Sequence, residues 1–446
     1  MRGNMEQTEK YGTEGQRDRE MEGRRDGERE GRREGGTERG RDREIFPPSL
    51  RPSVPPSLRP SVFLPLLICL LLFPNESSKA GQELDWASQS SGVLAKLSGV
   101  FFVDRDHGWV VGSNGTLLTT EDGGAKWRRQ TLPEGQKNEA VNDVWFSNSD
   151  RGLLLGEYGL YNRKGYIDWS ERIFLLMSNN RGANWKTGTL ARLPVKQLGQ
   201  TTSQPGGLSG RKPNEGSEML KPGQRPSDPI LLRMAFANDR IGWAVGEGGT
   251  IQYTDDGGAT WKMQEGPVRK LLYDVTAIDG KRAWAVGAGG TILRTVDGGE
   301  NWKEQSSNVT QTLRAVCFVD AERGWAVGSR GAIITTTNGG AQWRQQTSNV
   351  EQNLNDVVFV NAKEGSREGP RGGPREGPRE GPREGWIAGD RGLMLHTTDG
   401  GATWGSVELS THANLSRLFF IAPDCGWVVG TSGAIFKYGQ IPSPQN

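Results

Sequence analysis

The chain has 446 residues, of which 34% are hydrophobic, and its 55 Lys and Arg residues nearly balance its 53 Asp and Glu residues, for a net charge of +2. The same near balance holds within its charged N-terminal arm, which excludes an arm built for nucleic acid, where one sign of charge dominates.

The arm covers residues 1–60 and is of low complexity. Arg, Glu, Asp and Gly fill most of it, and Pro- and Ser-rich sequence follows. Such a segment buries too little apolar surface to offset the entropy lost on ordering, so we expect a disordered spacer.

A run of 12 apolar residues, Val62–Phe73, comes next. It is short for a membrane-spanning helix and is typical of the core of a secretory signal, and Ser78 and Ala80 offer small residues for a signal peptidase. Because about 60 residues precede it, two interpretations of residues 61–80 stay open. Translation starts internally near Ser49 and the signal is cleaved, or the segment is an uncleaved anchor. We favour export.

A spaced pair of tryptophans repeats through the rest of the chain. Trp86 and Trp109 are 23 residues apart, Trp109 and Trp127 are 18 apart, and these two spacings recur, so the repeat is 41 residues long. Each irregular interval equals a standard spacing plus an insertion, at about 159–172, 188–229 and 366–385. We expect the last two to be disordered. In the second repeat Leu153 replaces the tryptophan.

Each repeat contains four short β-branched or aromatic segments separated by turn residues, which predicts four strands. In the repeat from Leu313 these are LRAVCFV, GWAVG, AIITT and AQWRQQT. Seven such units predict an all-β, seven-bladed β-propeller with four-stranded antiparallel blades over residues 84–439. The chain begins this region with a lone fourth strand around Trp86 and ends it with three strands, so we expect the N-terminal strand to complete the last blade.

A turn of the form S/T-x-D-G-G-x-x-W precedes six of the tryptophans, which is the Asp box of bacterial neuraminidase repeats. Its acceptor residues are Asp122, Asn180, Asp256, Asp297, Asn338 and Asp399, and its tryptophans are Trp127, Trp185, Trp261, Trp302, Trp343 and Trp404. An Asp or Asn side chain at this position accepts backbone N–H groups, and glycine supplies the positive φ of the turn. We therefore interpret the boxes as structural.

These repeats, exemplified by GWVVGSNGTLLTTEDGGAKW, resemble the photosystem II stability/assembly factor propeller family over about residues 84–439. The resemblance implies a monomeric, exported, non-catalytic scaffold in the periplasm, the thylakoid lumen or the extracellular space. It also implies a protein partner, namely a newly made membrane-protein subunit in an assembly intermediate, and no cofactor.

The alternative is an Asp-box glycoside hydrolase, similar to sialidases, or a carbohydrate-binding propeller. Glycosidases use two facing carboxylates, and Glu157, Glu247 and Asp390 occupy equivalent turns between second and third strands. The sequence lacks the Arg-Ile-Pro signature of sialidases. The three histidines show no metal-ligand spacing, and we predict no metal site and no disulfide between Cys317 and Cys425.

The insertions at 159–172 and 188–229 fall in connections that share one face of a propeller, whereas 366–385 falls on the Asp-box face. Aromatic and basic side chains gather in the first insertion: Tyr158, Tyr161, Arg163, Lys164, Tyr166, Trp169 and Arg172. Such side chains are typical anchors of protein interfaces, so we predict a partner-binding surface there. Tolerated loop growth is the other interpretation.

Overall fold

The structure, a computed structural model, describes residues 84–147, 150–159, 172–191, 229–360 and 384–440. The chain divides into two units, Met1–Glu76 and Ser77–Asn446, and all described residues lie in the second. The expectations for the arm, for the apolar run at 62–73 and for most of the insertions fall outside the described residues.

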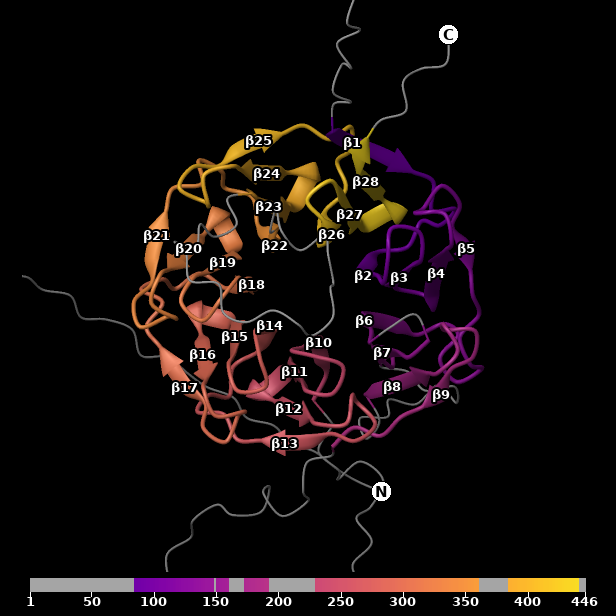
Figure 1. Cartoon of the computed structure of the whole chain (residues 1–446), viewed down its shortest axis with the longest axis horizontal. Coiled ribbons are helices and arrows are strands. Elements are labelled where there is room, and N and C mark those ends of the chain that lie inside the picture. The colour runs from indigo at the N-terminus through magenta and orange to yellow at the C-terminus, as the bar shows by residue number, and fades with distance from the viewer. Residues whose placement is uncertain (1–83, 148–149, 160–171, 192–228, 361–383, 441–446) are drawn as a thin grey trace, which may run out of the picture. The chain divides into compact units, whose positions relative to one another are not determined.

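Seven four-stranded antiparallel sheets stand in a ring around a central axis (Figure 1). Six sheets use consecutive strands, and the seventh has the order β1 (Leu84–Gln89), β28 (Ile435–Gln440), β27 (Cys425–Gly430), β26 (Leu415–Ala422). The predicted fold class and the predicted closure by the N-terminal strand are therefore confirmed.

The first strand of each blade lies innermost, nearest the axis of the ring (Figure 1). These strands are β2 (Leu97–Phe102), β6 (Ala140–Phe146), β10 (Leu231–Phe236), β14 (Leu272–Ala277), β18 (Leu313–Phe318), β22 (Leu354–Val360) and β26. In every one the pairing with the second strand shifts register by one residue near its start, as between Leu97 and Gly99. Each first strand thus carries a β-bulge.

The second strands are buried on both faces because a neighbouring blade packs against each side. They are β3 (Gly108–Gly112), β7 (Gly152–Glu157), β11 (Gly242–Gly246), β15 (Ala283–Gly287), β19 (Gly324–Gly328), β23 (Glu384–Gly389) and β27. This double burial explains their continuous apolar sequence, of which GWAVG is the recurring form. Since β23 begins at Glu384, the last two residues of the expected 366–385 insertion belong to a strand.

The third and fourth strands complete each blade toward the rim. The third strands are β4 (Thr116–Thr120), β8 (Ile173–Ser178), β12 (Ile251–Thr254), β16 (Ile292–Thr295), β20 (Ile333–Thr336), β24 (Met394–Thr397) and β28. The fourth strands are β5 (Arg128–Arg129), β9 (Lys186–Thr187), β13 (Lys262–Gln264), β17 (Lys303–Gln305), β21 (Arg344–Gln346), β25 (Gly405–Val407) and β1. Short outer strands limit the edge available for pairing with another chain.

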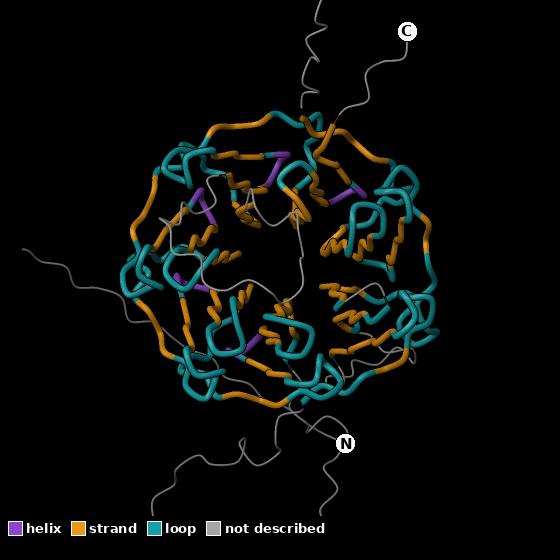
Figure 2. The backbone as a smooth tube through the Cα atoms, viewed as in Figure 1, coloured by secondary structure: helices purple, strands orange, loops and turns teal. Residues whose placement is uncertain are grey.

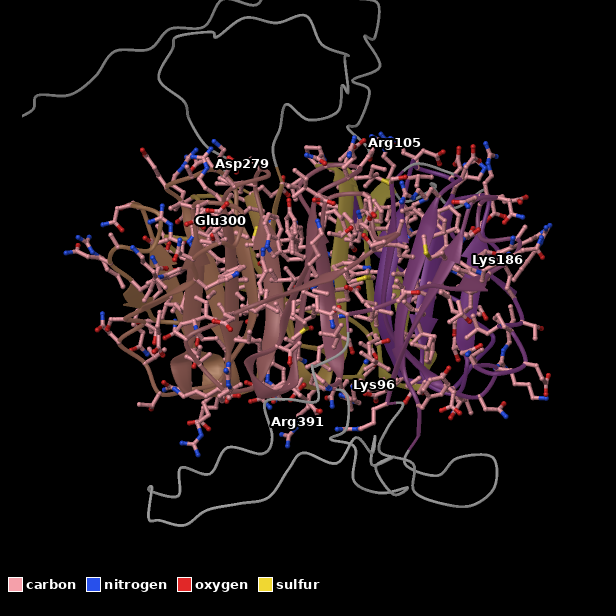
Figure 3. All side chains as sticks on the ribbon, turned by 90° about the horizontal axis from the view of Figure 1, so that it is seen from below. Lys96, Arg105, Lys186, Asp279, Glu300 and Arg391 are labelled. Atoms are coloured by element: carbon pink, nitrogen blue, oxygen red, sulfur yellow. The ribbon has the colours of Figure 1, made fainter. Side chains whose placement is uncertain are left out.

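In five blades a single 3-10 turn joins the second and third strands (purple in Figure 2). These turns are η2 (Glu247–Gly249), η3 (Ala288–Gly290), η4 (Ser329–Gly331), η5 (Asp390–Gly392) and η6 (Thr431–Gly433). They lie on one face of the ring with the fourth-to-first connections, as Lys96 and Arg391 show in Figure 3, and Arg105 and Asp279 mark the Asp-box face. The predicted division of the loops between two faces is confirmed.

Stacked rings hold neighbouring blades together. In four blades the second-strand tryptophan stacks closely on a phenylalanine from the first strand of the next blade, as in Trp284 with Phe318 at 3.7 Å between ring centroids. The second blade has Leu153 instead, and its cross-strand neighbour Trp145 stacks on Phe236 at 3.7 Å. The missing indole is therefore supplied from the adjacent strand.

Candidate functional site

The seven bulges place one side chain per blade at the mouth of the channel. A bulge re-aims a side chain that would otherwise alternate with its neighbours. The seven bulge residues are half-buried and line a single cavity of about 540 Å³: Ser98, Asn142, Leu232, Tyr273, Arg314, Asn355 and Ser416. We refer to this cavity as the channel mouth.

The channel mouth is polar and carries basic groups. Lys96, Arg233 and Arg314 line it together with one carboxylate, Asp390. Two asparagine amides, from Asn353 and Asn355, donate to the Asp390 carboxylate at 2.8 Å. The acid is therefore tied to the wall of the cavity, whereas the basic groups give it an excess of positive charge.

Arg314 is held by its neighbours but keeps donor capacity. Its guanidinium lies 6.0 Å from the centre of the Tyr273 ring, and one terminal nitrogen donates to Asn355 Oδ1 at 3.2 Å. Its Nε is buried without a hydrogen-bond partner in the described part of the chain. Because an arginine fork is rigid and planar, this placement suits recognition of a carboxylate.

A ring of charge lies directly beneath the mouth, one residue further along the first strands. It contains Asp143, Asp274, Asp356, Arg233 and Arg417, and we call it the ionic layer. Arg233 lies 3.7 Å from Asp143, and Arg417 reaches both Asp356 at 3.4 Å and Asp274 at 3.6 Å. Arg417 therefore links the fourth, sixth and seventh blades.

The three carboxylates of the ionic layer also accept backbone N–H groups from the next first strand. Asp143 accepts from Met234 at 2.8 Å, Asp274 from Val316 at 3.0 Å and Asp356 from Leu418 at 2.7 Å. Each aspartate thus clamps its own blade to the following one. Such fully desolvated clamps stabilise only while their partners stay in place.

Asp274 differs from the other two carboxylates of the layer. Burial raises its pKa to about 6, against the lowering effect of Arg417. Its side chain is 4% exposed, and its Oδ1 has no hydrogen-bond partner. Asp274 is therefore the carboxylate of the layer with the fewest hydrogen bonds.

The predicted partner-binding residues are described only at the two ends of their loop. Tyr158 accepts a hydrogen bond from Gln136 at 2.7 Å and packs against Phe174, so it belongs to the base of the loop. Arg172 pairs with Glu247 of the next blade at 2.9 Å. Tyr161, Arg163, Lys164, Tyr166 and Trp169 lie outside the described residues, and the surface remains a prediction.

The Asp boxes satisfy their polar groups internally. The Asp297 carboxylate accepts from Thr295 Oγ1, the Asn301 backbone and the Asn301 amide at 2.8 to 3.0 Å. These bonds, first that from the Asn301 side chain, lower the pKa of Asp297 to about 2. Asn338 and Asn180 accept the equivalent backbone N–H group at 2.9 Å and 3.0 Å.

A glutamine three residues after a fourth-strand or Asp-box tryptophan ties four of the blades to the next, a role that the sequence reasoning missed. Gln264 donates to Gly298 O at 2.8 Å and accepts from Trp302 Nε1 at 3.0 Å. Gln89 does the same to Gly123 and Trp127 from the closing strand. The recurring W-x-x-Q spacing was the available signal.

The three carboxylates weighed as glycosidase candidates have separate surroundings. Asp390 lines the channel mouth, Glu247 is ion-paired with Arg172, and Glu157 ends β7. Within the described ranges no group of three or more His, Cys, Asp or Glu residues could hold a metal. No helix among these same residues is long and apolar enough to cross a membrane.

Fold and site define the class: an Asp-box β-propeller with seven blades and a basic channel mouth. A family model described as photosynthesis system II assembly factor YCF48 matches residues 78–194, 213–306 and 300–370. The chain belongs to this family.

Individual relatives are distant. The photosystem II assembly protein Ycf48 of Thermosynechococcus vestitus is 24% identical over 223 residues, which cover 42% of this chain and 64% of that protein. A solved structure of YCF48 bound to D1 peptide matches with a TM-score of 0.56 at 19% identity, covering 80% of this chain and 97% of that one. A GH74 xyloglucanase from Xanthomonas campestris matches with a TM-score of 0.52 at 13% identity, over 79% of this chain and 53% of the enzyme, which shows the fold alone.

Proposed function

We propose that this protein is a non-catalytic assembly scaffold whose channel mouth binds a segment of a photosystem II reaction-centre subunit. Membership of the Ycf48 family and the likeness to a YCF48 structure bound to D1 peptide support the choice of partner. The observation that carries the choice of site is the convergence of seven bulge side chains on one basic cavity.

The channel mouth suits an extended segment that carries a carboxylate. Its volume of about 540 Å³ admits a few residues of a peptide, and Lys96 and Arg314 offer charged donors. Arg314 stands on β18 and is held by Tyr273 and Asn355, so little of its ordering entropy is lost on binding, whereas Lys96 is an exposed residue just before β2. Arg314 and Lys96 supply the affinity in this proposal, and the asparagines supply orientation.

The test is the affinity of residues 81–446 for a labelled D1 peptide at pH 7.5. Arg314→Glu should weaken binding by about 10-fold or more, because it removes a desolvated charged donor and adds repulsion. Lys281→Glu, which makes the same charge change in an exposed turn of the Asp-box face, is the control and should change affinity less than about 2-fold. Equal affinities of the two variants would place the site elsewhere.

We further propose that the protein is exported and meets its partner outside the compartment of synthesis. The apolar run at 62–73, followed by small residues, supports this. Fractionation of native cells with an antibody to the propeller tests it, and a mature chain that begins near residue 81 is the expected result. A full-length chain in the soluble compartment of synthesis would contradict export.

A further inference from the structure

The ionic layer contains one more negative group than positive groups. Its three carboxylates face two guanidinium groups, and two pairs form, Arg233 with Asp143 at 3.7 Å and Arg417 with Asp356 at 3.4 Å. Asp274 shares Arg417 at the longer distance of 3.6 Å. The layer therefore has a net charge of −1 when all its groups are ionised, and Asp274 is the carboxylate in excess.

Hydrogen bonding singles out the same residue. Both oxygens of Asp143 accept backbone N–H groups, from Val144 and Met234. Both oxygens of Asp356 do the same, from Val357 and Leu418.

Asp274 accepts one such bond, from Val316, and its Oδ1 has none. Among buried carboxylates, the one with the fewest hydrogen bonds to its charged form takes up a proton most readily. Geometry and charge balance thus identify the same group.

Arg233 of β10 is a second positive charge that acts on Asp274, after Arg417 of β26, but it forms its ion pair with Asp143. Asp356 of β22 adds negative charge, and the buried thiol of Cys317 comes from β18. The adjoining strands β11 and β15 carry no charged residue, and Glu247 of η2 is already paired with Arg172.

The ionic layer is mechanically joined to the channel mouth. Arg233 belongs to both, and it donates to Ser98 O at 2.9 Å and to Asn142 O at 3.1 Å, the carbonyls of two mouth residues. Asp274 and Asp356 directly follow the mouth residues Tyr273 and Asn355 in the chain. A change of charge in the layer therefore occurs one residue away from side chains that line the channel mouth.

We propose that Asp274 is a proton-operated switch of the channel mouth, so that acidification strengthens the binding of an acidic ligand there. Protonation removes the excess negative charge beneath Lys96 and Arg314. The ion pairs of Arg417 with Asp356 and of Arg233 with Asp143 stay in place. The switch rests on the proposed function of the mouth. It adds the condition under which the site binds most tightly.

The experiment measures the affinity of a rhodamine-labelled oligo-aspartate peptide by fluorescence anisotropy at pH 5.0 and pH 7.5. This probe stays charged at both values, because its side chains ionise near pH 3.9. Removing one charge about 10 Å from the ligand should tighten binding by roughly 3- to 10-fold at the lower pH.

Asp274→Asn, which keeps the shape and removes the charge, should bind equally well at both pH values and as tightly as the wild type at pH 5.0. Glu300→Gln makes the same charge change on the other face of the ring and should keep the wild-type pH dependence. A wild type with equal affinity at both pH values, or an Asp274→Asn variant with the wild-type pH dependence, would overturn the switch alone. No binding of the probe at either pH would overturn the site and the switch together.

A direct titration keeps the proposal testable if the variant folds poorly. In wild-type protein labelled at aspartate Cγ, the resonance assigned to Asp274 through its own backbone should titrate with a midpoint near pH 6. A midpoint at or below pH 4 would show that Asp274 stays ionised and would end the proposal.

Discussion

The glycine before each second-strand tryptophan is required by the phenylalanine ring opposite it. A β-carbon on Gly324 would lie 2.5 Å from the ring of Phe318, its cross-strand partner. The fourth blade has no phenylalanine at this position: Ala277 faces Ala283, and there the glycine is replaced. The loss of the large ring on one strand thus accompanies the gain of a β-carbon on the other.

This pairing predicts strong coupling in a double-mutant cycle. Gly324→Ala should destabilise the protein by about 1–3 kcal/mol because it overpacks the ring, and Phe318→Ala by about 3–5 kcal/mol because it leaves a cavity. The double variant reproduces the Ala277 and Ala283 pair, so its loss should be well below the sum. Urea unfolding measures all three, and additive losses would contradict the argument.

At the scale of single residues the sequence indicated the Asp boxes but not the channel mouth. An Asp box is a local motif, with these bonds of the Asp297 carboxylate made between Thr295 and Asn301. The ionic layer is not local, because Arg417 and Asp274 come from blades far apart in the chain. Ring closure alone brings them together.

At the scale of strands, the repeat predicted the first three strands of a blade closely and the fourth less well. The expected strand AQWRQQT is reduced to Arg344–Gln346. The Asp-box turn occupies the preceding residues, because the backbone of Gln342 donates to Asn338. The turn motif therefore takes precedence over the β propensity of Trp343.

In the second blade the indole that stacks on the next blade comes from the first strand and not from the second. This blade therefore tests whether either of two paired positions can hold the tryptophan. Trp145 and Leu153 are cross-strand neighbours, and Trp145 stacks on Phe236. Trp145→Leu should cost about 2–4 kcal/mol by loss of this stack. Leu153→Trp alone should also destabilise, since Leu153 is fully buried beside the existing indole.

Exchanging both residues places the tryptophan where the other blades have it. The exchanged variant should therefore unfold closer to the wild type than Trp145→Leu does. Thermal unfolding followed by tryptophan fluorescence decides this, with far-ultraviolet circular dichroism as the control for fold. A double variant less stable than either single variant would mean that the second blade has repacked around Leu153.

At the scale of the whole molecule, counting tryptophans was enough to predict seven blades and their closure. The count was sufficient because the repeats have a fixed length. It leaves a single extra strand at the N-terminal end of the repeat region and a blade with one strand missing at the C-terminal end. Whole-ring properties such as the basic mouth could not be counted in this way. They depend on which side chains a bulge turns inward, and a bulge leaves no mark in the sequence spacing.

The closing strand β1 should contribute to stability far beyond its six residues, because it pairs with every residue of β28 and covers the long edge that β28 would otherwise expose. Trp86 faces Tyr438 across the pair and packs its ring 5.4 Å from that of Trp386, so it also joins the seventh blade to the sixth. Trp86→Ala should lower the free energy of unfolding by about 3–5 kcal/mol.

A chain that lacks residues 1–91 should in addition expose β28 and associate through it, seen as higher-mass species in light scattering after size exclusion. A chain that lacks only residues 1–80 keeps β1 and should match the full-length protein in both measurements. If removal of β1 leaves a monomer of unchanged stability, the ring is held by its blade interfaces alone.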